Sequence, residues 1–374
     1  MDNILLSAVL AFIITFFAIP VIIQIAKSKK LFDEPDERKV HKTVIPTLGG
    51  LGIFAGFIIA ILMGVPAGIN PEFQYFVAAA IVIFFLGIKD DIIILSASKK
   101  FIGQLIAAGI IIKFGGIQIT NMHGFLGIYE IPYVAGVILS FFTIIVITNS
   151  FNLIDGVDGL AGTLGLITTL AFGTYFIYIG KTAYGVLAFS LSGSIIAFLI
   201  YNFSPAKIFM GDTGSLLLGL VNSILVIKFI NLASVSQAPF AIQASPAVGF
   251  AIMIIPLFDT LRVFGLRILD RRSPFSPDRN HIHHYLLDLG FSHRKITITC
   301  ATVTMTFIAF AFVFRNADTT LLIGLILASA TALTAIIYYA RRRSRNAYVP
   351  KASEKELVKS HKILTLVSDT VEVD

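Results

Sequence analysis

Charge is what this sequence has least of. Of its 374 residues, only 14% are Asp, Glu, Lys or Arg, whereas 56% are hydrophobic, and the mean hydropathy is +0.87. Soluble domains carry about 25% charged residues, so this composition excludes a water-soluble globule and a disordered chain. Tryptophan is missing, and the single cysteine, Cys300, excludes an intrachain disulfide framework. Long apolar runs take up the rest of the composition.

These runs predict an all-α, polytopic membrane protein. A helix needs about 20 apolar residues to cross the hydrocarbon core of a bilayer. Eleven candidate spans lie at roughly 4–26, 46–64, 74–89, 98–113, 133–151, 159–179, 183–201, 214–231, 246–268, 296–314 and 320–340. The first is too long for a signal-peptide core and lacks a small-residue cleavage site, so we expect it to be retained. We expect one integral-membrane domain over 1–340 and a basic, then polar, cytoplasmic tail over 341–374.

The basic residues predict the orientation. If the loops alternate between the two sides, only 4 of the 29 Lys and Arg share the side of the N-terminus: Lys113, Lys181, Lys228 and Arg315. Because cytoplasmic loops carry the excess of positive charge, we expect the N-terminus outside and the C-terminus in the cytoplasm. The net charge of +7 does not indicate nucleic acid, since no basic stripe alternates with aromatic residues. Paired glycines and a short apolar alternation predict a small outer β-hairpin near 114–132.

Polar side chains gather at the cytoplasmic ends of the expected spans, where they are costly. Asp90 and Asp91 follow the third span, and adjacent carboxylates disfavour each other's charge unless a cation lies beside them. A solvated turn is the alternative interpretation. Further along, Asn149, Asn152, Asp155 and Asp158 recur every third residue. Their oxygens suit a hard divalent cation such as Mg²⁺, and an ordinary capping turn is the alternative.

Two more clusters of polar residues are candidates for binding phosphate. Asp212 precedes the eighth span, where it is either a simple helix cap or an acid for a metal that holds phosphate. Three of the seven histidines, His281, His283 and His284, lie within four residues beside Arg279. Arginine binds phosphate oxygens bidentately, and zinc usually requires Cys or a further spaced ligand. The positive-inside rule explains the arginines of this loop but not its histidines.

Two pairs of charged residues have open interpretations. Lys99-Lys100 are either membrane anchors or phosphate contacts, and Asp259 with Arg262, one turn apart inside the ninth span, are expected as a buried ion pair. Taken together, acids for a divalent cation and opposing Lys, Arg and His at one membrane face are the groups that phosphoryl transfer needs. One reactant is then a lipid phosphate and the other is water-soluble.

Five strings, in this order, resemble the polyprenyl-phosphate N-acetylhexosamine-1-phosphate transferase family over about residues 1–315. They are Asp33-x-Pro35-x-x-Arg38-Lys39-x-His41-Lys42 with Pro46-Thr-x-Gly49-Gly50, Asp90-Asp91, Asn152-Leu-Ile-Asp155-Gly-Val-Asp158-Gly, Phe209-Met-Gly-Asp212-Thr-Gly-Ser, and Arg272-Ser-Pro-Phe-Ser-Pro-Asp278-Arg279-Asn-His281-Ile-His283-His284. One bacterial branch uses UDP-N-acetylmuramoyl-pentapeptide and carries three consecutive histidines. The other uses UDP-N-acetylglucosamine and carries the spaced His-Ile-His-His seen here, and an eleventh span also suits that branch.

The resemblance implies transfer of N-acetylglucosamine-1-phosphate from UDP-N-acetylglucosamine to undecaprenyl phosphate, with release of UMP. The reaction would start lipid-linked cell-surface polysaccharide, such as lipopolysaccharide, on the cytoplasmic face of the bacterial inner membrane. Mg²⁺ is the expected cofactor, with Mn²⁺ as the alternative, and a homodimer is expected by family analogy only. A transporter or a non-catalytic lipid-binding homologue is the distant alternative.

Matching the motifs residue by residue assigns expected roles. The metal contacts are Asp212 and Asn152, and the catalytic residues are Asp90, Asp91, Asp155 and His283. The substrate contacts are Lys100, Asp158, Asn202, Phe209 (stacked on uracil), Arg279, His281 and His284.

Overall fold

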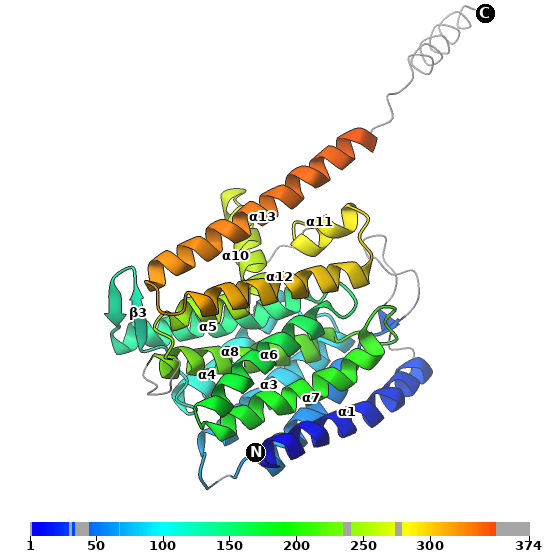
Figure 1. The fold of residues 1–374 in the computed structure, drawn as a ribbon. Coiled ribbons are helices and arrows are strands. Elements are labelled where there is room, and N and C mark those ends of the chain that lie inside the picture. The colour runs from blue at the N-terminus through cyan, green and yellow to red at the C-terminus, as the bar shows by residue number, and fades with distance from the viewer. Residues whose placement is uncertain are drawn as a thin grey trace, which may run out of the picture.

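Long helices lie alongside one another through most of the chain (Figure 1). The computed structural model describes residues 2–29, 32–33, 45–66, 68–234, 241–273 and 279–348. Its helices are α1 (Asp2–Lys29), α2 (Gly49–Gly64), α3 (Glu72–Ile92), α4 (Ala97–Lys113), α5 (Tyr133–Ile154), α6 (Leu160–Tyr178), α7 (Thr182–Asn202), α8 (Gly211–Ala233), α9 (Ser245–Ile252), α10 (Ile254–Leu269), α11 (Ile282–Asp288), α12 (His293–Val313) and α13 (Thr319–Tyr348). The expected helical class is confirmed.

Two pairs of short strands accompany the helices. β1 (Phe32–Asp33) pairs antiparallel with β2 (Ile45–Pro46), and β3 (Asn121–Phe125) pairs antiparallel with β4 (Ile128–Glu130). The second pair falls within the segment 114–132 where a hairpin is expected. In Figure 1, β3 and the N-terminus lie toward one end of the bundle and α11 lies toward the other. That the hairpin faces the outside of the cell stays a prediction.

The helices are those of a multi-pass membrane protein. Within the described residues, seven helices are long and apolar enough to cross a bilayer: α1, α5, α6, α7, α8, α12 and α13. The number rises to eight if α9 and α10 are taken as one bent span, and α2 is apolar but shorter. The expected count of eleven spans is therefore not confirmed, and the expected orientation stays a prediction.

The expected ninth span, 246–268, is not one straight helix. α9 and α10 meet at Met253 with an angle of 89° between them. Pro256 has no N–H to donate to the carbonyl of Ile252, so the helical hydrogen-bond ladder is interrupted at this point. As a result α10 leaves the line of α9 and carries its own side chains toward α11.

α8 is the centre of the bundle. It packs against α2, α3, α5 and α6, and most of its residues are buried. A helix that is apolar on every face is buried in a protein core or spans a membrane. α8 also carries two ionisable groups near its ends, Asp212 in the first turn and Lys228 toward the last. Sixteen residues separate them, about 24 Å along a helix.

The start of α8 lies against the start of α2 with no room for a side chain between them. A Cβ atom on Gly50 would lie 2.2 Å from the backbone nitrogen of Gly214. The amide of Gly50 also donates to the carbonyl of Met210 at 2.8 Å, and that of Gly49 donates to Phe209 at 2.9 Å. The Pro46–Gly50 string therefore fixes the turn that leads into α8.

The variant Gly50→Ala should move α2 away from α8, because the added methyl group meets backbone atoms that cannot rotate aside. We expect a loss of about 1–3 kcal/mol in stability, the usual cost of overpacking, together with lower activity. Thermal unfolding of the purified chain would measure it. Gly324→Ala is the matched control, since a Cβ there meets nothing within 4 Å. Equal unfolding temperatures for the two variants would contradict the close contact.

Candidate active site

Asp91 caps the start of α8. Its Oδ1 accepts a hydrogen bond from the amide of Asp212 at 2.7 Å, and its Oδ2 accepts from the amide and the hydroxyl of Thr213 at 3.0 and 2.6 Å. Gly211 has a φ of +71°, which lets the chain turn sharply into the helix at this point. Because these two amides are already paired, they are not open to a phosphate, and Asp91 acts by positioning Asp212.

Asp90 points to a different partner from its neighbour. The ammonium of Lys100 lies between the carboxylates of Asp90 and Asp212, forming an ion pair with both, the one with Asp212 at 2.8 Å. The other oxygen of Asp90 accepts from the amide of Leu95 at 2.7 Å. One cation thus offsets the repulsion between two acids that are 122 residues apart in the chain.

Asn152 reaches the same carboxylate from α5. Its Nδ2 donates to Oδ1 of Asp212 at 2.9 Å and to Oγ of Ser215 at 3.0 Å. The amide group is therefore oriented with its nitrogen toward Asp212. Asn149, one turn earlier, pairs instead with Gln104 and belongs to the contact between α4 and α5. The expected series of four polar residues does not share one helix face, because α5 ends at Ile154.

Asp155 lies in the turn after α5 among three other acids. Desolvation by burial and then the charges of Asp212, Asp91 and Asp158 together raise the pKa of this carboxyl to about 8. The residue as a whole is half-buried. At neutral pH this group is mostly protonated, unlike a carboxylate paired with a cation.

Asp158 and Asn202 hold loops together. Asp158 accepts from the amide of Ala206 at 3.1 Å, and its carboxylate lies 3.1 Å from Nδ1 of His293. Asn202 accepts from the amide of Gly159 at 2.9 Å and donates to the carbonyl of Ile208 at 2.8 Å. Both are buried. They fix the loop that leads to Phe209, which is half-buried and pairs through its amide with Pro46.

Asp259 of α10 contacts the start of α11, which carries His283 and His284 and is called the histidine helix. This carboxylate contacts Nδ1 of His281 at 3.0 Å, accepts from the amide of Ile282, and forms the expected ion pair with Arg262 at 2.7 Å. Asp259 is buried, so each of these contacts also satisfies a charge that would otherwise be costly. The bend between α9 and α10 is what brings Asp259 to this place.

His283 connects the histidine helix to the acids. A Cβ atom on Gly156 would lie 2.7 Å from its Nε2, so the ring packs directly on the turn that carries Asp155. Desolvation, with His284 next in effect, lowers the pKa of His283 to about 3. Its imidazole is therefore neutral at pH 7. Within the described part of the chain, Nδ1 of this buried ring has no hydrogen-bond partner.

Two of the expected loop residues are less closely placed. His284 is half-buried, and its ring lies 4.3 Å from that of His283. Desolvation, then the charge of Arg279, lowers the pKa of His284, and Arg279 itself is exposed to solvent. Residues 34–44 and 274–278 lie outside the described residues, so Arg38, His41 and Asp278 of the motifs are not placed.

α13 contacts the histidine helix from the other side. Nε of Arg341 donates to Asp288 at 2.7 Å, and its guanidinium lies 4.3 Å from the centre of the Tyr285 ring. Tyr285 also faces Arg262, at 5.4 Å. The helix continues to Tyr348, past residue 341 where the tail is expected to begin, and Arg341 belongs structurally to the site. The sequence did not indicate Arg341 or His293 as site residues, and it gave Ser215, the last residue of one motif, no role; the contacts of all three depend on distant helices.

Arg341→Ala should loosen α11 without unfolding the bundle. Loss of a partly exposed ion pair and a cation–π contact costs about 1 kcal/mol, or about a fivefold change in the opening equilibrium. Hydrogen–deuterium exchange of residues 282–288 would measure it. The exposed neighbour in Arg342→Ala is the control. Unchanged exchange of α11 in Arg341→Ala would show that α13 does not hold this helix.

The chain is similar to known proteins along most of its length. The sequence model of the family described as glycosyl transferase family 4 matches residues 73–230. The chain is 34% identical, over 85% of its length and 87% of the relative's, to the probable undecaprenyl-phosphate N-acetylglucosaminyl 1-phosphate transferase of Bacillus subtilis (strain 168).

Two further relatives are more distant. The decaprenyl-phosphate N-acetylglucosaminephosphotransferase of Mycobacterium leprae (strain TN) is 33% identical over 77% of this chain and 78% of its own. The undecaprenyl-phosphate alpha-N-acetylglucosaminyl 1-phosphate transferase of Escherichia coli (strain K12) is 30% identical over 75% and 76%. From the match to residues 73–230 and from relatives that align along most of its length, the chain belongs to glycosyl transferase family 4.

Proposed function

We propose that the chain transfers N-acetylglucosamine-1-phosphate from UDP-N-acetylglucosamine to undecaprenyl phosphate and releases UMP. One observation carries the proposal: the Asp212 carboxylate contacts both Lys100, which is paired with Asp90, and Asn152. Acid, amide and ammonium groups from three separate helices thus meet at one point. The printed names of the relatives support the sugar and the polyprenyl phosphate acceptor. They do not favour the muramoyl-pentapeptide alternative.

We propose that a lipid and a soluble nucleotide both reach the site at this end of the bundle. Asp212 is in the first turn of a buried helix, the Pro46–Gly50 segment contacts that turn, and His283 of α11 packs on the turn that carries Asp155. A transporter would instead place its charged groups near the middle of the membrane. We assign this end to the cytoplasmic face of the bacterial inner membrane, following the distribution of Lys and Arg.

The donor set suits Mg²⁺ that is held mainly by substrate. Within the described residues, no group of three His, Cys, Asp or Glu side chains could hold a metal alone. Mg²⁺ commonly uses one or two carboxylates together with substrate phosphates and water. Asp212 would supply a carboxylate ligand. Asn152, whose Nδ2 donates to Asp212 and Ser215 in this structure, would supply its Oδ1 only after its amide group turned over. When bound, the ion would neutralise charge on the diphosphate and on the departing UMP.

The chain's own residues would orient and neutralise the reactants. Lys100 already neutralises two acids, and a phosphate oxygen can take the place of either carboxylate beside it. A phosphate monoester has a second pKa of about 6, so the lipid nucleophile is largely ionised without a base. Asp90 would then place the lipid phosphate through Lys100. His283, neutral at pH 7, would donate a hydrogen bond to a phosphate or sugar oxygen. Arg279, which is exposed to solvent, would offset the negative charge of the bound phosphates.

The first test is direct synthesis. Purified chain in detergent, given labelled UDP-N-acetylglucosamine, undecaprenyl phosphate and Mg²⁺, should form a labelled lipid and release UMP. Chelation with EDTA should stop the reaction and added Mg²⁺ should restore it. Asp212→Asn should lower the rate at least about 100-fold, a loss typical of removing one key electrostatic contact. Asp270→Asn, which changes an exposed acid after α10, should not. Full activity of Asp212→Asn would remove the assigned role.

The second test concerns the order of steps. We propose a single displacement, in which a lipid phosphate oxygen attacks the sugar-bearing phosphorus directly. The rival is a phospho-aspartyl intermediate, with double displacement. With lipid acceptor removed, the chain should not exchange labelled UMP into UDP-N-acetylglucosamine, because no intermediate forms without the lipid. Exchange in the absence of acceptor, lost in Asp90→Asn, would contradict the direct route.

A further inference from the structure

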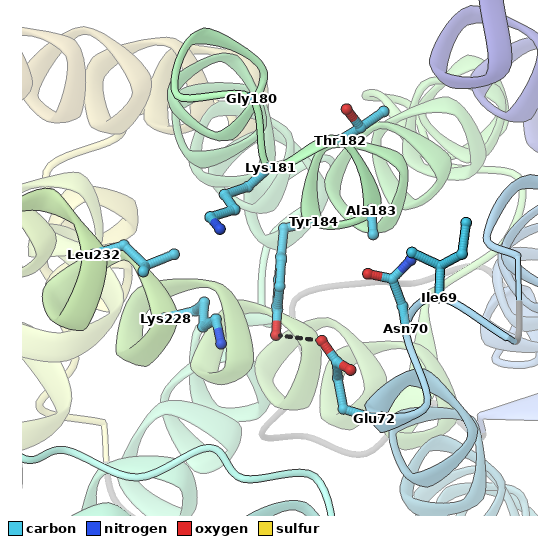
Figure 2. Close-up of a pocket in the computed structure, with 10 residues that line it drawn as sticks. All are labelled: Ile69, Asn70, Glu72, Gly180, Lys181, Thr182, Ala183, Tyr184, Lys228 and Leu232. Atoms are coloured by element: carbon cyan, nitrogen blue, oxygen red, sulfur yellow. Dashed lines mark hydrogen bonds between the residues drawn. The ribbon is translucent and has the colours of Figure 1, made fainter. Parts of the chain in front are cut away.

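A second polar site lies at the opposite end of α8 from Asp212. A pocket of about 390 Å³ opens between the start of α3, the turn from α6 to α7, and the last turns of α8. Its volume is within the range of small-ligand sites. Figure 2 shows the residues that line it, which include Asn70, Glu72, Lys181, Tyr184 and Lys228. None of these residues contributes to the contacts around Asp212.

Two lysines enter this pocket. Figure 2 shows the side chains of Lys181, from the turn before α7, and Lys228, from α8, directed into the same space. Lys228 is half-buried and its ammonium lies 5.0 Å from the centre of the Tyr184 ring, whereas Lys181 is exposed at the rim. Lysines near the ends of spans usually extend toward water along the surface. Lys228 instead lies over a buried tyrosine inside a cavity.

The acid of the pocket does not neutralise these lysines directly. The carboxylate of Glu72 accepts a hydrogen bond from the Tyr184 hydroxyl at 3.3 Å. Among the described residues, no carboxylate oxygen lies within 4.0 Å of the ammonium of Lys181 or Lys228, so neither lysine forms an ion pair with them. Two positive charges and one negative charge leave the pocket with one positive charge. Such a site favours a ligand that carries a single negative charge.

We infer that this pocket binds a phosphodiester anion. A phosphodiester carries one negative charge at neutral pH, and lysine ammoniums bind phosphate oxygens as point charges. The amide of Asn70, which also lines the pocket, offers a further hydrogen-bond donor. The same chemistry occurs in the headgroup of a phospholipid and in a soluble phosphodiester. Because the pocket lies at the end of a membrane-spanning helix, a lipid headgroup is the expected source.

Lipid binding to the purified full chain tests the inference. Native mass spectrometry would count phosphatidylglycerol retained by the wild type and by the variant Lys181→Gln/Lys228→Gln. We expect about tenfold weaker retention in the variant, the usual effect of losing a charge-assisted contact. Lys113→Gln, an exposed lysine outside the pocket, is the matched control and should retain lipid as the wild type does.

Glycerophosphoglycerol, the same headgroup without acyl chains, separates the two sources. If it displaces phosphatidylglycerol from the wild type at equal concentration, the site takes soluble phosphodiesters. If it does not, the site takes the lipid. Either result, combined with dependence on the two lysines, supports the inference. Equal retention by the double variant and Lys113→Gln overturns it. Sugar-phosphate transfer, measured alongside, reports on folding and on the other end of the molecule, so the two proposals can fail separately.

Discussion

The start of α8 is a buried helix end, and a buried helix end needs partners for its free amides. The carboxylate of Asp91, on the neighbouring helix α3, is this partner, because it accepts hydrogen bonds from the amides of Asp212 and Thr213. An unpaired buried amide costs about 1–3 kcal/mol, so this cap decides how α3 and α8 sit against each other. The position of Asp212 follows from the cap. Lys100 and Asn152 can then meet one carboxylate, although they come from α4 and α5.

Two neighbouring acids have separate tasks for a geometric reason. Successive residues on a helix point about 100° apart, so Asp90 and Asp91 cannot face the same partner. Asp91 faces the backbone of α8, and Asp90 faces Lys100. The sequence indicates that the pair needs a cation beside it or a solvated turn, and in the structure Lys100 lies beside Asp90. It does not predict which acid takes the cation, because that depends on how α3 is rotated in the bundle.

Much of the site was predictable, since polar residues in an apolar chain are conspicuous. The strings around Asp90, Asn152 and Asp212 indicated a shared site, and their side chains meet. The support of α11 was not predictable. A buried ion pair was one interpretation of Asp259 and Arg262, but the sequence does not show that the bend at Met253 brings Asp259 into contact with His281. Arg341 resembled one basic residue among several after the last span, and only the path of α13 places it on Asp288.

The charges of α8 lie near its ends for a physical reason. A helix buried on all sides has free amides at its start and free carbonyls at its end, so polar partners are required at these two places. Its dipole also favours an acid at the start and a cation toward the end. Asp212, in the first turn, follows this pattern, whereas Lys228 lies before the last turn, with its ammonium over the ring of Tyr184. One apolar helix therefore separates two polar sites, and substitutions at one end are not expected to change binding at the other.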